Sequence, residues 1–337
     1  MVLLLFTANF PYGATEKTFL EVEIQHLHSV FERVILVPRN IPGNRSPIPN
    51  GIEVDKSYST YLNSTIGRLS GSISVLQSLG FYQEIFLRPN LLLYPKSIIR
   101  LASFYGGAYL TSRWVKSWIK DNDHLKKKLI FYTYWLDQAA MGIGLVKQQH
   151  PEICLVSRAH GYDIYPEHYF KHAFWPGRRE TLTYLNQLFP DSEAGTRYLR
   201  ESYPEFASKI QTNLMGVPDT DFLNRPSQDG VIRIVSCSML RPEKRVGEIF
   251  EGFRHAARLY PKQRFEWYHI GNGETRFELQ KLADETLPTN AKAYLPGYSD
   301  KQSLIRFYRD TPLDVFVNLS TTEGIPVSIM EAISCGI

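Results

Sequence analysis

The sequence predicts an α/β protein with two doubly wound parallel-sheet domains that face each other across a cleft. Short apolar runs alternate along the chain with longer segments of helical spacing, as parallel sheets with crossover helices require. The apolar runs lack polar alternation, which is typical of strands covered on both faces. A length of 337 residues allows two domains, each large enough to bury its own core.

Seven apolar runs are the expected strands of these sheets. They are Val2–Thr7, Val34–Pro38, Leu129–Tyr134, Cys154–Ala159, Val231–Ser236, Phe265–Ile270 and Val315–Leu319. No basic leader precedes the first run, so we expect a buried strand there rather than a signal peptide. No apolar run reaches the roughly 18 residues that a membrane-spanning helix needs. Helices are expected between the strands, for example at Phe19–Phe31, Ala194–Tyr203 and Arg245–Tyr260.

Turn-forming residues gather just before Val231, where a new apolar run begins. Such a concentration marks a linker. We therefore expect an N-terminal domain at residues 1–217, a linker at 218–230 and a C-terminal domain at 231–337. The last expected helix runs out at Gly336, where another strand should start, so we expect the C-terminal domain to be incomplete.

The charge and the cysteines narrow the class of protein. The three cysteines lie far apart with no Cys-x-x-Cys pair, which indicates neither a zinc site nor a disulfide framework and fits a reducing compartment. The net charge of +4 is mild, but basic and aromatic residues are mixed between Arg88 and Lys128. Two interpretations stay open: a face for an anionic membrane, or a solvated helix with its aromatic side chains in the core. No nucleic-acid-binding module accompanies the stretch, so nucleic acid is not an expected partner.

The segment from Ser320 to Ala332 carries the most informative pattern of the chain. A hydrophobic run leads into a polar turn, and Pro326 suits the first position of the helix that follows. Gly324 lets the backbone approach a ligand, and a helix N-terminus favours negative charge. Glu323 and Glu331 flank that place, where carboxylates can bind sugar and ribose hydroxyls around a phosphate. The pattern predicts a nucleotide-sugar site; the alternative is a surface helix with two solvated glutamates.

Two segments of the first domain are further candidates. The turn after the first strand contains Gly13, whose lack of a side chain lets backbone N–H groups reach a phosphate; an ordinary strand–helix turn is the alternative. Arg158-Ala159-His160-Gly161-Tyr162-Asp163 ends another strand, where open α/β sheets bind ligands. His160 is a candidate catalytic group or a structural histidine, and Asp163 would orient its imidazole or bind an acceptor hydroxyl.

A basic segment follows the first strand of the second domain. Arg241, Lys244 and Arg245 lie within five residues of one another. Breaking a nucleotide–sugar bond leaves a diphosphate, and without a metal ion lysine and arginine must neutralise it. A basic helix start is the alternative, but it would place cations where the helix dipole disfavours them.

These segments together resemble the family-4, or group 1, retaining glycosyltransferases, which have the GT-B fold of two Rossmann-like domains. The resemblance rests on the Glu–seven residues–Glu spacing, the segment around His160, and Phe10-Pro11-Tyr12-Gly13. It implies that Glu323 contacts the donor sugar, that Glu331 holds the nucleotide ribose, and that His160 faces the reaction centre. Lys244 matches the family's lysine, and we assign Arg158 and Asp163 to the acceptor.

The chain also departs from the family pattern. Met239 occupies the place of the family's arginine, so Arg241 or Arg245 is expected to replace it. The turn at Gly271-Asn272-Gly273 resembles a Gly-x-Gly turn near the nucleotide, and Gly297 is expected beside the base. Arg276 stands where a dinucleotide-binding fingerprint needs a third glycine, which disfavours a dehydrogenase.

The expected activity is the transfer of a sugar from a nucleotide-sugar donor to a hydroxyl of a glycan or lipid-linked acceptor, with retained configuration. Bacterial surface polysaccharide synthesis, of capsule or lipopolysaccharide, is the expected setting, in the cytoplasm and peripheral to the inner face of an anionic membrane. No cofactor or metal is expected, because Asp121-Asn122-Asp123 and Asp219-Thr220-Asp221 do not close strands. The alternatives are a GT-B nucleotide-sugar 2-epimerase and a non-catalytic nucleotide-binding fragment. The sugar, the acceptor and the linkage stay open.

Overall fold

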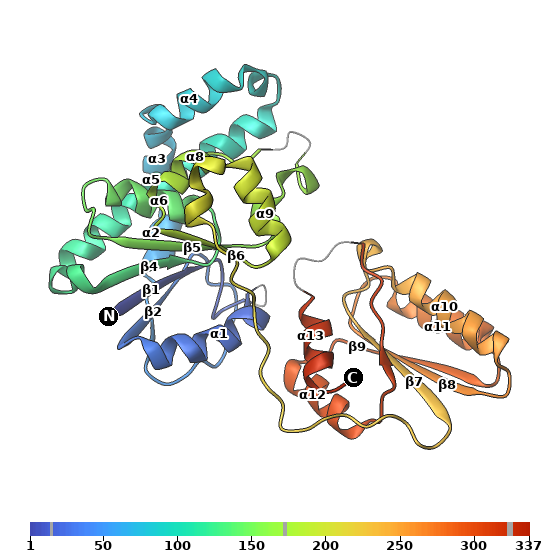
Figure 1. Ribbon diagram of the computed structural model, residues 1–337. Coiled ribbons are helices and arrows are strands. Elements are labelled where there is room, and N and C mark those ends of the chain that lie inside the picture. The colour runs from blue at the N-terminus through green and yellow to red at the C-terminus, as the bar shows by residue number, and fades with distance from the viewer. Residues whose placement is uncertain (14–15, 171–173, 322–325) are drawn as a thin grey trace. The chain divides into compact units, whose positions relative to one another are not determined.

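The computed structural model describes residues 1–13, 16–170, 174–321 and 326–337. The chain divides into two compact units, Met1–Met215 and Gly216–Ile337, which are described one after the other (Figure 1).

A six-stranded, fully parallel sheet forms the centre of the first unit. Its order is β3-β2-β1-β4-β5-β6. The strands are β1 (Val2–Thr7), β2 (Arg33–Pro38), β3 (Ile52–Val54), β4 (Leu129–Thr133), β5 (Cys154–Ala159) and β6 (Gln187–Pro190). The strand order reverses direction between β1 and β4, and ligands of doubly wound sheets bind at the carboxyl ends beside such a point.

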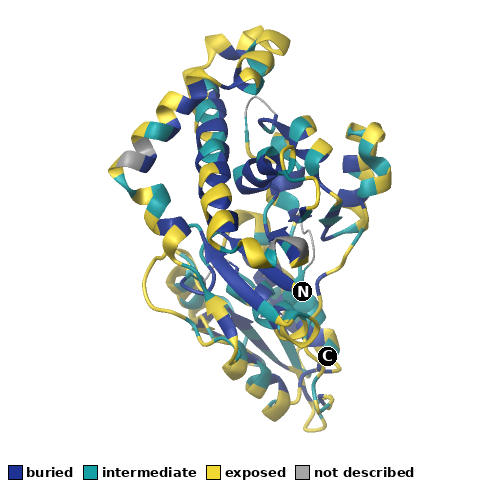
Figure 2. Ribbon diagram, turned by 90° about the vertical axis from the view of Figure 1, so that its left-hand side faces the viewer, coloured by how far each residue is buried: buried dark blue, intermediate teal, exposed yellow. Residues whose placement is uncertain are grey.

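Helices cover both faces of this sheet, as the continuous apolar strands predict (Figure 2). The helices are α1 (Lys17–Val30), α2 (Ser57–Asn63), α3 (Thr65–Leu76), α4 (Leu79–Leu87), α5 (Pro95–Asp121), α6 (Gln138–Lys147), α7 (Gly161–Ile164), α8 (Arg178–Tyr184) and α9 (Glu193–Ser202), with 3-10 turns η1 (Pro89–Leu93), η2 (Asp123–Lys128), η3 (Pro166–His168) and η4 (Pro204–Lys209). Leu3 and Leu5 of β1 pack with Leu20 of α1, whereas Leu4 packs with Val115 of α5. Successive strand residues therefore enter two cores.

The aromatic residues of the basic stretch lie mainly inside the first unit. Tyr105, Trp114 and Trp118 of α5 are buried. The indole N–H groups of Trp114 and Trp118 donate to Ser57 Oγ and Asp55 Oδ2, each at 3.0 Å. These contacts agree with the interpretation that places the aromatic side chains in the core. Within the described ranges, no helix is both long enough and apolar enough to cross a membrane.

The second unit has a four-stranded parallel sheet of order β10-β7-β8-β9. Its elements are β7 (Val231–Cys237), η5 (Pro242–Lys244), α10 (Val246–Leu259), β8 (Arg264–Ile270), α11 (Arg276–Thr286), β9 (Ala291–Gly297), α12 (Lys301–Asp310), β10 (Val315–Phe316) and α13 (Val327–Ser334). Trp267 of β8 is fully buried against Phe250 of α10, and Val235 of β7 packs with Leu304 of α12. This sheet too is covered on both faces.

The predicted α/β class with parallel, Rossmann-like sheets is confirmed. The strands β3, β6 and β9 were not predicted. Strand β10 is shorter than the predicted Val315–Leu319. All four are edge strands. In β9, for example, the exposed residues Lys292, Tyr294 and Pro296 alternate with less exposed neighbours. An edge strand has one neighbour instead of two, so it need not be a continuous apolar run.

Candidate functional site

The turn after β1 is closed by the buried side chain of Glu16. Its Oε1 accepts from the N–H of Ala8 at 2.7 Å, and its Oε2 from the N–H groups of Asn9 and Phe10 at 2.7 and 2.9 Å. The indole of Trp135 donates a fourth hydrogen bond at 2.6 Å. Backbone groups that we expected to reach a phosphate are thus bound to a carboxylate of the protein itself.

Gly13 has a packing role in this turn. A Cβ atom at Gly13 would lie 2.7 Å from Cβ of Asn9, so the turn closes only around a glycine. Ala14 and Thr15, which follow it, lie outside the described residues.

His160 lies at the carboxyl end of β5, almost buried, with partners at both ring nitrogens. Its Nδ1 is 3.3 Å from Oδ2 of Asp191, and its Nε2 is 3.1 Å from the carbonyl oxygen of Tyr134. Both partners are acceptors, and a neutral imidazole has one N–H, so the neutral ring can donate to one of them at a time. The rings of Tyr134 and Trp135 flank it at 4.8 Å between centroids. The orientation of the imidazole is therefore fixed by several groups.

Arg158 is buried in a network of its own. Its Nε donates to the hydroxyl of Tyr132 at 2.9 Å and lies 3.1 Å from Oε2 of Glu23. Its Nη1 donates to the carbonyl of Asn213 at 2.8 Å. A guanidinium held in this way positions β4, β5 and α1 relative to one another, which differs from the acceptor contact expected from the sequence.

Asp163 is also buried and faces the backbone. Its Oδ2 accepts from the N–H of Leu136 at 3.2 Å and of His160 at 3.4 Å. Burial raises the pKa of Asp163 to about 6, although the electrostatic effects of His160 and Arg178 oppose this rise. The carboxylate next to the imidazole ring is that of Asp191, whereas Asp163 accepts hydrogen bonds from the backbone.

Two groups of this cluster were not singled out from the sequence, Glu16 and Asp191. Asp191 directly follows β6, an edge strand that lacked the expected apolar run, so its place at a strand end could not be recognised. Its Oδ1 is buried and has no hydrogen-bond partner in the described part of the chain. An unpaired buried acceptor of this kind can receive a hydroxyl or N–H group of a ligand.

The basic segment of the second unit forms the turn η5 and the start of α10. The side chains of Arg241 and Arg245 are exposed. Arg245 has a left-handed backbone, with φ of 50°, and its Nε lies 3.2 Å from Oε1 of Glu248. Arg241 Nη1 is 4.0 Å from Oε1 of Glu243. Such exposed pairs are weak, so both guanidinium groups can turn toward an anion.

Glycines hold the strand ends of the second unit together. Gly271 has φ of 154°, and a Cβ atom there would lie 1.7 Å from the carbonyl oxygen of Ser238. At Gly273 a Cβ would lie 2.5 Å from the carbonyl oxygen of Leu240. The N–H of Gly271 donates to the carbonyl of Gly297 at 2.9 Å. The turns after β7, β8 and β9 therefore pack backbone against backbone.

The terminal segment reaches the same edge of this sheet. Glu323 and Gly324 lie outside the described residues. The residue shortly before them, Thr321, donates its N–H to the carbonyl of Glu243 at 2.9 Å, beside the basic turn. The chain that leads to the predicted donor-sugar contact is thus anchored next to Lys244.

Glu331 is buried in α13 and forms an ion pair with Lys301, the first residue of α12. The distance from Lys301 Nζ to Glu331 Oε1 is 3.1 Å. Burial raises the pKa of the Cys237 thiol to about 12, and the negative charge of Glu331 adds to this effect. Glu331 therefore lies near the carboxyl end of β7. The sequence did not indicate a role for Lys301, because its partner Glu331 lies in the next helix, beyond β10.

This edge of the second unit can bind a molecule with negative charge and hydroxyl groups. Arg241, Lys244 and Arg245 supply cations, and Glu331 supplies a carboxylate paired with Lys301. Among the described residues, no three His, Cys, Asp or Glu side chains are grouped to hold a metal ion.

Two Rossmann-like parallel-sheet units of this kind define the fold class of the GT-B glycosyltransferases. Residues 220–337 match the family model of the glycosyl transferases group 1. The match covers the C-terminal part of the chain and confirms there the resemblance to the group 1 glycosyltransferases. A comparison with curated proteins finds no match.

Solved structures share the fold over the whole chain. The lipopolysaccharide outer core galactosyltransferase WaaB in its apo form has a TM-score of 0.63 at 15% identity, covering 100% of this chain and 79% of that one. Trehalose-6-phosphate synthase OtsA has a TM-score of 0.62 at 11% identity, with 99% and 82% covered. The structure described as trehalose-6-phosphate from E. coli bound with UDP-2-fluoro glucose has a TM-score of 0.61 at 12% identity, with the same coverage. Identities this low show a common fold.

Proposed function

We propose that the protein transfers a sugar from a nucleotide-sugar donor to a hydroxyl group of an acceptor. The observation that carries the proposal is the buried Glu331–Lys301 pair near the end of β7, in the unit that matches the group 1 family. Removing an ion pair from water is costly, which makes a role for its charges in ligand binding reasonable. A carboxylate near the carboxyl ends of parallel strands can accept hydrogen bonds from the ribose hydroxyls. The structure bound with UDP-2-fluoro glucose, which has the same fold, supports a UDP-type donor.

In this proposal the second unit binds the donor and stabilises the leaving group. Glu331 accepts hydrogen bonds from the ribose hydroxyls, and Lys301 keeps the carboxylate in one orientation. Lys244, Arg241 and Arg245 neutralise the diphosphate as the glycosidic bond breaks, which takes the place of a metal ion. Gly271, Gly273 and Gly297 let the backbone of the turns come close to the nucleotide. Glu323 positions the donor sugar.

The first unit binds the acceptor in this proposal. His160, fixed by Asp191 and by the carbonyl of Tyr134, faces the reaction centre. Arg158 and Asp163 act as positioning residues, because both are buried and bound to the protein. We assign residues 1–217 to the acceptor, 218–230 to the linker and 231–337 to the donor. The resemblance to group 1 enzymes supports a retained configuration at the transferred sugar.

We also propose a role in bacterial surface polysaccharide synthesis at the cytoplasmic face of the membrane. The shared fold with a lipopolysaccharide galactosyltransferase supports this setting. The acceptor is then a glycan or a lipid-linked glycan.

Thermal stabilisation by nucleotides tests the donor site. UDP, GDP, CMP and their sugar conjugates are added to the protein, each with and without EDTA. We expect one nucleotide to raise the melting temperature in both conditions, and Glu331→Gln to abolish that shift. The matched control is Glu285→Gln, which breaks an exposed Glu–Lys pair on α11 with Lys281 at 3.8 Å. A shift retained in Glu331→Gln, or no shift with any nucleotide, would overturn the proposal.

Product analysis separates the proposed transferase from its alternatives. With the identified donor and an acceptor, NMR of the product should show the donor's anomeric configuration. Donor turnover without any acceptor would indicate a 2-epimerase instead. Nucleotide binding without turnover, across a panel of glycan and lipid acceptors, would indicate a non-catalytic binding protein.

A further inference from the structure

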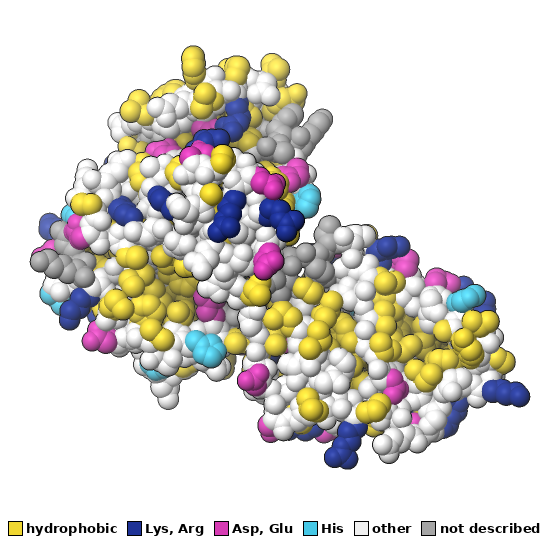
Figure 3. Space-filling view, viewed as in Figure 1, with side chains coloured by type: hydrophobic (Ala, Val, Ile, Leu, Met, Phe, Trp, Pro, Cys, Tyr) yellow, Lys and Arg dark blue, Asp and Glu magenta, His cyan; other side chains and the backbone are white. Residues whose placement is uncertain are grey.

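Hydrophobic side chains are exposed around α3, α4 and η1 of the first unit, over α4 at the top of Figure 3. Six of them, which we call the apolar rim, are each 66% exposed or more: Leu76, Leu79, Phe86, Leu87, Leu93 and Ile99. Between residues 69 and 99 the charged residues are Glu84, Arg88 and Lys96. Glu84 pairs with Arg88, so Lys96 adds an exposed positive charge. Surfaces of this kind mark contact sites.

The rim continues into a groove between α3 and α5. The groove has a volume of about 730 Å³, within the range of ligand pockets. Gly71 of α3 and Gly106 of α5 line it, and a Cβ atom at Gly106 would lie 3.1 Å from the carbonyl oxygen of Gly71. The two helices thus meet closely along one side. Leu76 and Ile99 belong to both the groove and the rim, so the groove opens onto the exposed apolar surface.

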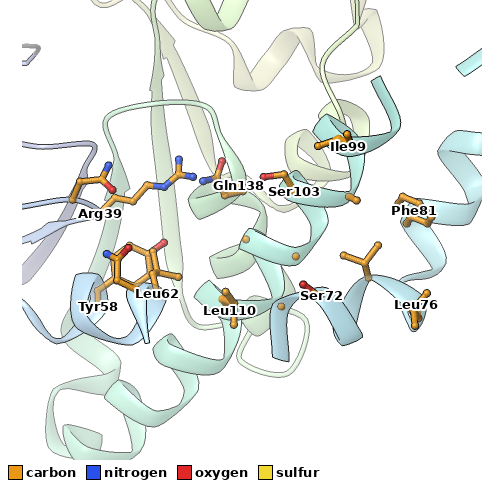
Figure 4. A pocket seen from close by; sticks show the side chains of 17 residues that line it. Arg39, Tyr58, Leu62, Ser72, Leu76, Phe81, Ile99, Ser103, Leu110 and Gln138 are labelled. Carbon is orange, nitrogen blue, oxygen red and sulfur yellow. The ribbon is translucent and has the colours of Figure 1, made fainter. Parts of the chain in front are cut away.

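The groove has its charged group at one end, where Leu62 also lies, and an apolar lining at the other (Figure 4). Arg39 and Gln138 lie at one end, and Leu76 and Phe81 at the other. The side chain of Arg39 is 40% exposed, and its Nη1 is 3.6 Å from Oδ2 of Asp137. With the amide of Gln138 turned so that its oxygen faces Arg39, the guanidinium also donates to that oxygen. Because Gln138 is neutral and the contact with Asp137 is long, the positive charge of Arg39 can still attract an anion. A molecule that fits the groove therefore has a polar or anionic end and an apolar chain.

The polar end of the groove lies beside the strand-end cluster of the same unit. Arg39 also lines a small adjoining cavity together with Thr7 of β1, Thr133 of β4 and Trp135. The ring of Trp135 lies 4.8 Å from that of His160. The polar end of the groove and His160 therefore belong to neighbouring parts of the same sheet edge.

We infer that this groove binds the lipid part of a lipid-linked acceptor, presented from a bilayer into which the apolar rim inserts. The inference rests on the proposed function and adds the class of acceptor to it. Arg39 pairs with the anionic linkage of the lipid, while the hydrocarbon chain follows Val75 and Phe81 to the rim. Each methylene group removed from water favours binding, and Lys96 favours an anionic lipid surface.

The apolar rim overlaps in part with the stretch in which the sequence predicted a membrane face. The expectation covered Arg88–Lys128, in which Tyr105, Trp114 and Trp118 are buried in α5. Leu76, Leu79, Phe86 and Leu87 of the rim precede that stretch, whereas Leu93 and Ile99 lie within it. A hydrocarbon chain that leaves the groove at Leu76 and Ile99 passes directly onto the rim. This continuity favours a lipid, because a rigid protein partner would not need the groove and the rim to be connected.

Vesicle flotation tests the rim. The whole protein is mixed with phosphatidylcholine vesicles, with and without phosphatidylglycerol. We expect Phe86→Ser/Leu93→Ser to reduce partitioning about tenfold or more. The control is Phe277→Ser/Leu259→Ser, which removes two exposed apolar side chains of the second unit, 73% and 61% exposed, and should leave partitioning unchanged. If the rim variant floats like the parent, or if light scattering shows that the rim joins two copies of the chain, the inference is wrong.

Hexadecyl phosphate in phosphatidylcholine vesicles tests the groove. We expect this lipid to increase flotation of the parent protein several-fold, and Arg39→Gln or the groove-filling Ser103→Trp to remove the increase. Ser103→Ala is the matched control and should keep it. An increase that survives Ser103→Trp, or an equal thermal shift with inorganic phosphate alone, would overturn the inference.

The two proposals fail separately in these experiments. Nucleotide-induced stabilisation reports the second unit and contains no lipid, so it stays unchanged when the rim or groove variants lose lipid binding. Loss of the nucleotide shift with lipid binding intact would contradict the transferase and leave a lipid-binding groove.

Discussion

The carboxyl ends of the strands are held together differently in the two units. In the first unit, side chains hold the strand ends together. Glu16 accepts hydrogen bonds from three backbone N–H groups, and Arg158 contacts both Glu23 and Tyr132. In the second unit, glycines hold the strand ends together, because Gly271 and Gly273 allow backbone contacts that a Cβ atom would block.

This difference decides which polar groups stay available to a ligand. In the first unit much of the hydrogen-bonding capacity at the strand ends is used within the protein. In the second, backbone contacts close the turns, and exposed arginines remain at the same edge. A strand end built from glycine contacts can keep its charged side chains for an anionic ligand.

Replacing Gly271 should have the largest effect on this comparison. Gly271→Ala puts a methyl group into the carbonyl of Ser238 and a side chain at a φ that favours glycine. We expect a loss of about 4 kcal/mol or more in the free energy of unfolding of the second unit. Hydrogen exchange of the amides of β7 and β8 measures it.

The matched control is Gly161→Ala at a strand end of the first unit, where a Cβ atom would meet nothing within 4 Å. If both variants are equally stable, backbone contacts do not hold the second unit's edge.

Glu16 is the corresponding test in the first unit. Glu16→Gln keeps the shape but removes the charge and turns an NH₂ group toward N–H donors. We expect a loss of about 3 kcal/mol, read from chemical denaturation. Glu201→Gln, at an exposed position of α9, should change stability by less than about 0.5 kcal/mol. If Glu16→Gln leaves the free energy of unfolding unchanged, the turn does not depend on this carboxylate.

The two units should respond oppositely to acid. Burial lowers the pKa of His269 in the second unit to about 4, whereas Asp163 in the first is raised to about 6. As pH falls from 7 to 5, His269 binds a proton in the unfolded state but stays neutral in the folded state. This difference lowers the free energy of unfolding of the second unit by about 2 kcal/mol. Folded Asp163 takes up its proton before the unfolded form does, so the first unit gains about 1 kcal/mol over the same range.

Hydrogen exchange protection of β8 and β5, compared at pH 5 and pH 7, measures the two changes separately. His269→Gln should remove the loss in the second unit, and Asp163→Asn the gain in the first. Parallel changes in both units at every pH would contradict the opposite shifts.

The smallest effect concerns a glycine without a close neighbour. Gly252 lies inside α10, and a Cβ atom there would meet nothing within 4 Å. Gly252→Ala should therefore stabilise the second unit by about 1 kcal/mol, because alanine favours the helix. A rise of a few degrees in melting temperature would show it, and a fall would show that glycines in this unit serve more than close contacts.

The sequence predicted the central strands because each is apolar on both faces. β1, β5 and β7 begin at the predicted residues, and β4, β7 and β8 end within one residue of the prediction. The edge strands β3, β6 and β9 were missed, because a strand with one neighbour carries a weaker apolar signal. Candidate residues such as His160 were found because they follow a recognisable strand.

The partners of those residues could not be read from the sequence. Trp135 and Glu16 are 119 positions apart, and His160 and Asp191 are 31 apart. Nothing local distinguishes Glu16 from the other acids of its segment, or Lys301 from the other lysines. Contacts at such separations depend on how strands are ordered in the sheet.

The sequence by itself determined the α/β class, the central strands and the positions of polar residues at strand ends, because these follow from local periodicity and turn chemistry. The tertiary structure alone decided that Glu16 fills the turn after β1, that Lys301 pairs with Glu331, and that α3 and α5 enclose a groove open to an exposed apolar surface. Burial and charge pairing are properties of the packed chain, in which residues far apart in sequence become neighbours.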